Sequence, residues 1–467
     1  MPISSARPGR ARVLPPALTG ALCLFATSVA FGQRSTLDAV MRDTTLENGL
    51  HVVVVPNPTV PLVTIQVTIR NGAFTQLSEP DEGVPHLLEH MLFRSFGDSG
   101  FGEAASKLNA SYNGTTGEET VTYYITLPSE NLDRGVRLLA DLMRAPRFSR
   151  ASLETEQRVV RGELERSASD PGYLLSATVD RTLWGNASGR KSAIGNVLTI
   201  NGATPARVKQ MYDRFYVPNN AAVVFAGDVA ADAAFASSAR HFVRWRRGTD
   251  PFSDLEIPPI PPLEEPQVVI VDIEASEVTL LIRWHGPSVR TDPDATFAAD
   301  VFSSIINDPV SQFQTRLVDS GLFQSVSMFY LTRAHVGPIS IRATTTIDQV
   351  VAASTALRQE VDRFSDPGYV TAEILAIAKK RQEVDWAMQM ETPSGLASFV
   401  GELWSVAGLD YTRGYLEEMQ AQQELDLESF VATYLTGRPR VMGINVSPTS
   451  RQELGPRLGA AIAPWRQ

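Results

Sequence analysis

A proline-rich stretch near the middle of the chain constrains its organisation most. Residues 248–266 contain six prolines. Such a segment is stiff and extended, and it cannot continue a helix or a central strand. It therefore predicts a linker at 248–267, between an N-terminal domain at 33–247 and a C-terminal domain at 268–467. The length of 467 residues suits two or three domains.

The two sides of this linker repeat one order of expected elements. Strands interspersed with helices in this order predict α+β domains, in which a sheet packs against helices. The paired segments are 52–71 and 268–286 (strand, turn, strand), 83–94 and 295–306 (helix), 120–127 and 339–346 (strand), and 131–143 and 349–364 (long helix).

The first expected helix carries a motif suited to a metal ion. His86, Glu89 and His90 read H-x-x-E-H, and histidines at i and i+4 lie one turn apart on the same helix face. Glu89 points to nearly the same side, where it can accept a proton from a metal-activated water. This order is the signature of the inverzincins. A structural polar cluster is the alternative, and at the corresponding place the second half has Ser303-Ser304.

A third ligand is expected on the helical segment around 154–165. Glu156 and Glu163 are seven residues apart, two turns along one helix face. One of them can bind a zinc ion while the other orients a ligand or water. The segment also reads as a solvated charged helix, because it contains Arg158, Arg161 and Glu165.

These residues resemble the insulinase/pitrilysin family of zinc peptidases, in the two-domain branch with the mitochondrial processing peptidases and bacterial periplasmic homologues. In that family a glutamate downstream of the motif completes the zinc site, and a second glutamate precedes it by two helical turns. Three further segments match in the family's order, at 48–55, 113–124 and 217–228. The resemblance covers nearly all of the chain after residue 32.

The resemblance implies a site and a fold. His86, His90 and Glu163 would hold one Zn²⁺ per chain, Glu89 would be the general base, and Glu156 would support a ligand. The two halves would be homologous α/β sandwich domains, of which only the first is catalytic. The activity implied is that of a zinc-dependent endopeptidase acting on short or unfolded peptides. The alternative is a non-catalytic or peptide-binding scaffold subunit of a heterodimeric complex.

The resemblance also implies how a substrate binds. A peptide would pair its main chain with the strand around 113–124, where Asn113, Thr115 and Glu119 are candidates for substrate contacts. Such pairing gives affinity with little sequence specificity.

In the family, an Arg and a Tyr from the second half or from another chain complete the site. The matching region here is 311–327. One register places Leu317 and Gln324 at the two positions, and the other places Arg316 and Phe323 there, so neither preserves both. We therefore expect a homologous partner subunit that carries the pair, in a heterodimer. A homodimer is the second choice.

The N-terminal 32 residues are expected to be an export signal. Three arginines, at 7, 10 and 12, precede an apolar stretch at 13–31. An N-terminal membrane anchor is the alternative. The single cysteine, Cys23, lies in this segment, so the mature chain has no disulfide or thiolate zinc site. We expect a periplasmic or secreted protein.

The charge of the chain excludes some partners. The formal net charge is −10, and it becomes −13 when the three arginines of the expected signal are removed. This argues against binding to nucleic acid or to anionic membranes. No other long apolar run is present, so no stable membrane insertion is expected.

Two further features are expected to be structural. Residues 97–100 resemble the nucleophile segment of serine peptidases, but a glycine-rich turn is the better reading because no free histidine base accompanies Ser99. His285 and His335 are expected to be structural or surface residues.

Overall fold

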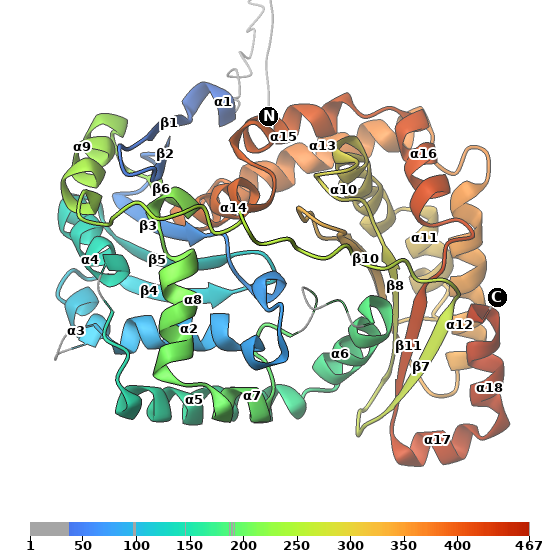
Figure 1. Cartoon of the computed structure of the whole chain (residues 1–467). Helices are drawn as coiled ribbons and strands as arrows, with labels where there is room; N and C mark the ends of the chain where they lie inside the picture. The colour runs from blue at the N-terminus through green and yellow to red at the C-terminus, as the bar shows by residue number, and fades with distance from the viewer. Residues whose placement is uncertain are drawn as a thin grey trace, which may run out of the picture. The chain divides into compact units, whose positions relative to one another are not determined.

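Two mixed β-sheets, one in each half of the chain, organise the fold (Figure 1). This computed structural model describes residues 37–466 except 97–99, 145, 186, 188–189 and 191. The expected signal at 1–32 and most of the expected turn at 97–100 lie outside the described residues. Among the described residues, no helix is long and apolar enough to cross a membrane.

The first sheet has six strands in the order β1-β2-β6-β3-β5-β4. Strands β2 and β6 are parallel, and the other neighbours are antiparallel. The strand formed last in the sequence, β6, inserts between β2 and β3, while β4 is an edge strand. The strands are β1 (Arg42–Thr45), β2 (His51–Pro56), β3 (Leu62–Ile69), β4 (Ser111–Thr116), β5 (Val121–Pro128) and β6 (Ala221–Gly227).

The second sheet has five strands, and its topology is that of the first sheet without β1. Its order is β7-β11-β8-β10-β9, with β7 and β11 parallel and the rest antiparallel. This confirms the α+β class expected from the repeated pattern. The strands are β7 (Gln267–Asp272), β8 (Val278–His285), β9 (Ser325–Tyr330), β10 (Pro338–Thr345) and β11 (Val441–Val446).

Each sheet packs helices of its own half against one face. In β5 the buried residues alternate with half-exposed ones, as expected for a strand with one covered face. The main helices of the first half are α2 (Val84–Arg94), α4 (Leu132–Arg144), α5 (Arg150–Ala168), α8 (Pro205–Phe215) and α9 (Ala231–Phe242). Those of the second half are α10 (Pro293–Asn307), α12 (Val350–Asp362), α13 (Ala372–Gln389), α15 (Leu409–Ala421), α16 (Glu424–Tyr434) and α18 (Pro456–Ile462).

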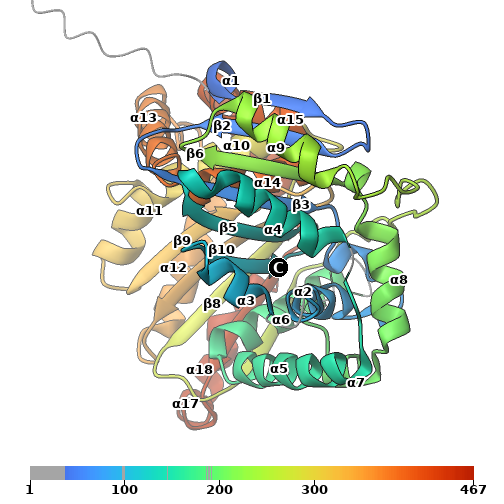
Figure 2. The same cartoon turned by 90° about the vertical axis from the view of Figure 1, so that its left-hand side faces the viewer.

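Helix α2 and the hairpin beside it are the elements nearest to the motif of the first half. The helix α2 packs against α5 and α8 (Figure 2) and against the edge strand β4. The segment 113–124, read from the sequence as one strand, is instead a hairpin of β4 and β5. The reason is a tight turn in which the Gly117 N–H donates to the Thr120 carbonyl at 2.8 Å.

The short helices of the two halves are α1 (Leu37–Val40), α3 (Gly100–Ser106), α7 (Val197–Gly202), α11 (Gln312–Gln314) and α17 (Pro448–Leu454).

The two halves exchange one helix each. The helix α14 (Pro393–Val406) belongs to the second half in sequence but packs on β3 and β6 of the first sheet. Its apolar residues Leu396, Ala397 and Val400 form a cluster with Val53, Val55, Val224 and Ala226. This explains why β3 and β6 are buried on both faces.

The reciprocal helix is α6 (Pro171–Trp184), which comes from the first half and packs on β7, β8 and β11. Its residues Leu175, Val179 and Leu183 form one buried cluster with Leu281 and Val441 of the second sheet. Figure 1 shows α6 beside β8 and β11, and α14 beside β3. The exchange buries apolar area only while both halves are folded. Such burial stabilises the folded state by about 25 cal/mol per Å².

Polar contacts accompany the packing of α14. The guanidinium of Arg70 lies 4.2 Å from the centre of the Trp404 ring and donates to the Ser405 carbonyl at 3.2 Å. The indole N–H of Trp404 donates to Nδ1 of His51 at 2.8 Å. Cation–π contacts of this kind stabilise by about 0.5–2 kcal/mol, so the exchanged helix is held by both apolar and polar groups.

Gly401 of α14 offers a test of this packing. A Cβ atom there would lie 2.4 Å from Nε2 of Gln66 and 2.6 Å from Oγ1 of Thr68. We expect Gly401→Ala to lower the free energy of unfolding by about 1–3 kcal/mol, because overpacking outweighs the gain in helix propensity. The midpoint of denaturant-induced unfolding measures the change.

Gly414→Ala on α15 is the matched control. A Cβ atom there meets only Cγ of Glu418, at 3.8 Å, so this variant should stabilise by about 0.5–1 kcal/mol. An equal rise in the unfolding midpoint for both variants would contradict tight packing at Gly401.

Candidate metal centre

The helix α2 places the three polar residues of the motif on one face. Its other residues Leu87, Leu88, Met91 and Leu92 are fully buried. The helix begins after Gly83, whose φ of 77° lies in the left-handed region that favours glycine. Because the apolar residues fix the rotation of the helix, the side chains of His86, Glu89 and His90 face one cavity.

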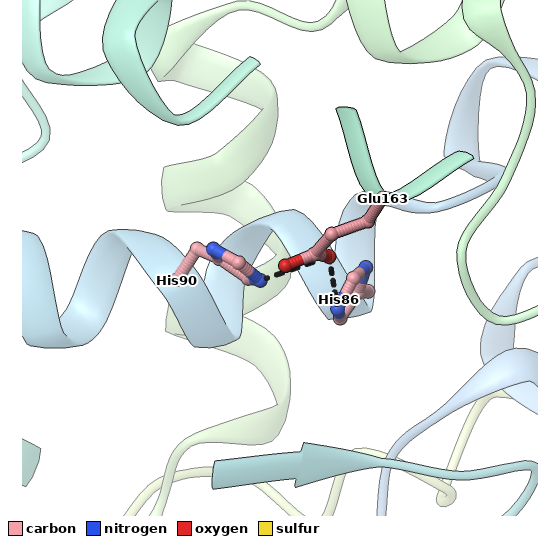
Figure 3. A group of neighbouring side chains, drawn as sticks. All are labelled: His86, His90 and Glu163. Atoms are coloured by element: carbon pink, nitrogen blue, oxygen red, sulfur yellow. Dashed lines mark ion pairs between the residues drawn. The ribbon is translucent and has the colours of Figure 1, made fainter. Parts of the chain in front are cut away.

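The helix α5 brings a third group to the two histidines. Oε2 of Glu163 lies 3.6 Å from Nε2 of His86 and 3.6 Å from Nε2 of His90. Figure 3 shows the carboxylate between the two rings. The ring centres are 4.8 Å apart, and the ring planes are nearly perpendicular. Among the described residues, this is the group whose possible ligand atoms all lie within 4.8 Å of one another.

The geometry fits a tetrahedral metal ion. Zinc binds imidazole nitrogen and carboxylate oxygen at about 2.0–2.2 Å, so two ligand atoms of a tetrahedral site lie about 3.4 Å apart. The two observed separations of 3.6 Å are close to this value and longer than an ordinary hydrogen bond. Two imidazoles and one carboxylate are also the donor set of several catalytic zinc sites.

Electrostatics keep one of the rings neutral. Burial, together with the nearby His90, lowers the pKa of His86 to about 4, so its imidazole is uncharged at neutral pH. The neutral form is the one that binds a metal. For His90, burial works in the same direction, but the hydrogen bond to Glu156 and nearby carboxylates raise the pKa overall.

Glu156 contacts the outer nitrogen of a histidine ring. Oε2 of Glu156 lies 3.3 Å from Nδ1 of His90, which leaves Nε2 of His90 for the cavity. A carboxylate on the outer nitrogen fixes the tautomer and orientation of a metal-binding histidine. Oε1 of the same side chain lies 3.7 Å from Nε of Arg94. The spacing of Glu156 and Glu163 on one helix therefore places one carboxylate between the rings and one behind them.

Glu89 is positioned by an edge strand. Oγ1 of Thr116, at the end of β4, donates to Oε2 of Glu89 at 2.8 Å. Burial raises the pKa of the Glu89 carboxyl, and Glu163 adds to the rise, while Thr116 and His90 oppose it. A carboxylate with a raised pKa is a better proton acceptor near neutral pH.

A cavity of about 870 Å³ opens at this site. The candidate substrate-contact residues Asn113 and Thr115 line it, as do His86, Glu89, His90, Glu156 and Glu163. Residues that the sequence reading missed also line it, namely Phe93, Tyr112 and Thr116. The alternation of a strand could have separated Thr116 from Thr115, but only the structure shows which face of β4 meets α2.

Glu119 has a different place from the one expected. It is 5% exposed and accepts hydrogen bonds from the backbone of Ala334 at 2.8 Å and from His335. Burial alone would raise the pKa of Glu119, but His335 and Arg190 lower it overall. Glu119 therefore ties the β4–β5 turn to the second half and does not line the cavity.

Most residues of the segment compared with the Arg/Tyr pair make structural contacts within the second half. Arg316 donates to the buried carboxylate of Glu360 at 3.0 Å. Leu317 and Phe323 are in the core of the second half, and Gln324 is exposed. His285, expected to be structural, stacks on Trp184 and contacts the Leu183 carbonyl at 3.1 Å.

The fold and the site define a class: a repeated α+β protein in which one half carries an H-x-x-E-H helix and a downstream glutamate. Comparison with known protein families agrees with this class. Residues 51–195 match the sequence profile of insulinase (peptidase family M16), and residues 202–382 match that of the peptidase M16 inactive domain. The chain belongs to the insulinase family, peptidase family M16.

Bacterial relatives support this assignment. The zinc protease PqqE of Helicobacter pylori is 24% identical over 400 residues, covering 80% of this chain and 86% of the relative. An uncharacterized zinc protease of Mycobacterium tuberculosis is 26% identical over 441 residues, covering 90% and 92%.

Solved structures have the same fold. A protease from Helicobacter pylori superposes with a TM-score of 0.77 at 20% identity, covering 87% of this chain and 99% of that one. The periplasmic protease PqqL from Escherichia coli gives a TM-score of 0.73 at 18% identity, covering 92% of this chain and 50% of that one.

The contact between Glu156 and His90 generates a prediction. We expect Glu156→Gln to weaken zinc affinity about 10–100-fold, because the neutral amide holds the outer nitrogen of His90 less strongly. Titration with a competing chelator measures the affinity. Glu154→Gln, a matched change at an exposed position of the same helix, should leave it unchanged. Equal affinities of wild type and Glu156→Gln would contradict the supporting role.

Proposed function

We propose that this chain is a zinc-dependent endopeptidase that hydrolyses short or unfolded peptides. The observation that carries the proposal is the convergence of His86, His90 and Glu163 within 4.8 Å beside Glu89. The bacterial relatives are named zinc proteases, and these names support the same metal and the same class of reaction. We assign one Zn²⁺ per chain to the three ligand residues.

The residues around the site have separable roles. A bound zinc ion supplies Lewis-acid chemistry, polarising a carbonyl and acidifying a water. Glu89 accepts the proton of the attacking water and returns it to the leaving amine. Thr116 holds one carboxylate oxygen of Glu89, which leaves the other for this transfer. Glu156 keeps His90 in the orientation that presents Nε2 to the cavity.

The edge strand β4 is the proposed docking strand for substrate. It has β5 on one side and, among the described residues, no strand on the other. An extended peptide can add there by main-chain hydrogen bonds, with Asn113 and Thr115 at the contact. A short or unfolded peptide can extend along β4 without first losing structure of its own, so such peptides are the expected substrates.

The alternative function is a scaffold subunit that binds peptides without cleaving them. It predicts that substitution of the motif leaves peptide binding intact and that the chain has no hydrolytic activity to lose. The complete set of ligand residues favours the enzyme. The inactive-domain profile matches residues 202–382, which begin after the motif and Glu163, so the match does not include the candidate ligands.

Substitutions within the motif should separate metal binding from catalysis. We expect Glu89→Gln to retain zinc and to lose peptide cleavage, because only the proton acceptor is removed. His86→Ala, His90→Ala and Glu163→Ala should each lose zinc as well, since fewer than three ligands remain. Metal content and cleavage of an unstructured peptide measure the two properties. Full activity of Glu89→Gln would exclude its role as base.

We also propose that a homologous subunit completes the active site. In the comparison with the family's Arg/Tyr pair, neither register preserved both residues, and Arg316 here is engaged by Glu360. The partner would lack H-x-x-E-H and carry the pair, in a heterodimer; a homodimer is the second choice.

An activity assay with and without the partner tests this proposal. We expect the zinc-loaded chain alone to cleave an unstructured peptide about 10²–10³-fold more slowly than the complex, the usual effect of a missing oxyanion donor. High activity of the isolated chain, unchanged by the partner, would reject the heterodimer. A catalytically inactive Glu89→Gln chain mixed with the partner controls for activity of the partner itself.

The proposed organisation follows from the same reading. Residues 1–32 are an export signal, 33–247 the catalytic domain, 248–267 the linker and 268–467 the non-catalytic domain. An exported, periplasmic or secreted location agrees with PqqL, which is named a periplasmic protease. We also propose that the protein does not bind nucleic acid and does not insert stably into a membrane.

A further inference from the structure

We propose that the second half holds a binding pocket for an organic cation, a primary alkylammonium group, at the place that corresponds to the metal centre of the first half. This site is distinct from the proposed catalytic centre and does not depend on the peptidase activity. Its walls come from α10, the edge strand β9, α13, α14 and α15.

The two pockets are built from corresponding elements. In the first half the site lies among α2, the edge strand β4 and α5, and in the second half among α10, the edge strand β9 and α13. The residues that line the cavities from the first helix of each set also share a spacing. They are His86, Glu89, His90 and Phe93 in one half, and Asp300, Ser303, Ser304 and Asn307 in the other.

The facing helices repeat a second spacing. Glu156 and Glu163 of α5 are seven residues apart, and so are Gln382 and Gln389 of α13, which line the second pocket. At the matching positions Asp300 stands in place of His86 and Ser304 in place of His90, and the two glutamates are replaced by amides. The described residues of this pocket include no histidine or cysteine, and hydroxyl and amide oxygens do not suit zinc.

The second pocket is a cavity of about 580 Å³ with unused acceptors. Oγ of Ser303, Oγ of Ser304 and Oε1 of Gln382 are buried and have no hydrogen-bond partner among the described residues. Ser303 and Gln382 are each only 7% exposed. Buried polar atoms without partners cost about 1–3 kcal/mol each. Because these three atoms are closed to solvent, a ligand in the cavity satisfies them only if their side chains turn toward it.

Asp300 gives the pocket its charge. Its carboxylate accepts a hydrogen bond from the Tyr415 hydroxyl at 2.8 Å, and within the described part of the chain no Lys or Arg pairs with it. Burial raises the pKa of Asp300 to about 7, as expected for a carboxylate without a counter-ion. A bound cation supplies the missing opposite charge.

The charged residues at the rim do not neutralise Asp300. Arg381 of α13 lines the pocket, but its guanidinium pairs with Asp308 at 3.3 Å. Asp385, also on α13, adds a second carboxylate to the lining. The net charge offered to a ligand is therefore negative.

Three aromatic rings form an apolar wall beside the carboxylate. The centres of Trp386 and Phe399 are 4.9 Å apart with perpendicular planes, and Phe399 and Tyr415 are 5.4 Å apart. Aromatic faces attract cations and pack against alkyl chains. An alkylammonium group has three N–H donors and no acceptor, which matches an acceptor-lined end and an aromatic wall.

The neighbouring strand is closed to a peptide main chain. The side chain of Asn307 donates to the Met328 carbonyl at 2.6 Å and accepts from the Met328 N–H at 2.8 Å. Gln314 donates to the Val326 carbonyl at 3.0 Å. These side chains occupy the edge of β9 at both residues, so the ligand enters as a head group, from a free amine or a lysine side chain, and not as an added strand.

Ligand-observed NMR titration of the full chain tests the proposal. The probes are n-butylammonium and its neutral analogue 1-butanol, with N-acetyl-lysine methylamide and N-acetyl-norleucine methylamide as the peptide-side-chain pair. We expect saturable binding of a cationic probe and none of its neutral partner. Asp300→Asn should weaken binding at least about tenfold, because a charged hydrogen bond is lost. Asp319→Asn, at an exposed carboxylate of the same half, should leave binding unchanged.

A second titration after removal of metal by a chelator separates this site from the first. Unchanged binding supports the proposal, and the two cationic probes show whether free amines or lysine side chains are the ligand. The proposal is overturned by absent binding of both cations, by equal binding of the neutral analogues, by equal binding to Asp300→Asn, or by loss of binding on chelation. The comparison of charged and neutral probes needs no variant, so it remains decisive if Asp300→Asn fails to fold.

Discussion

The exchange of α6 and α14 between the halves is the constraint on which the rest of the structure depends. Each sheet needs a helix from the other half to cover its second face, so neither sheet is complete alone. A second contact between the halves holds the turn beside the candidate metal centre, because the β4–β5 turn that follows Thr116 is tied through Glu119 to the backbone of Ala334. The hydrogen bond from Thr116 to Glu89 thus rests on a turn that both halves hold.

The sequence predicted the elements better than their partners. Strands and helices read from local hydrophobic pattern appear with bounds close to those expected, because the pattern of burial on one face is local. The exchange was not predictable, since α6 and α14 are ordinary amphipathic segments whose sequence does not say which sheet they cover. The segment 113–124 was read as one strand because the turn at Gly117 lies within a run of polar residues.

The candidate site shows the same division. The i, i+4 spacing of His86 and His90 places both on one helix face by geometry alone, and the downstream glutamates followed from the resemblance. What neither could supply was the distance between α2 and α5, which decides that Glu163 lies between the rings and Glu156 behind one of them. Thr116 was missed because its role depends on which face of an edge strand meets α2.

The exchanged helices also bear on how one half can change while the other does not. Two equivalent elements that each cover the other's sheet form the self-complementary contact of a symmetric dimer, here contained within a single polypeptide. Such a contact uses the outer faces of the sheets, whereas both pockets lie at their edge strands. A substitution at a pocket residue other than Phe399, which belongs to α14, therefore leaves the shared scaffold intact. The two halves can keep a common architecture while their pockets diverge, one toward imidazole and carboxylate, the other toward carboxylate, hydroxyl, amide and aromatic groups.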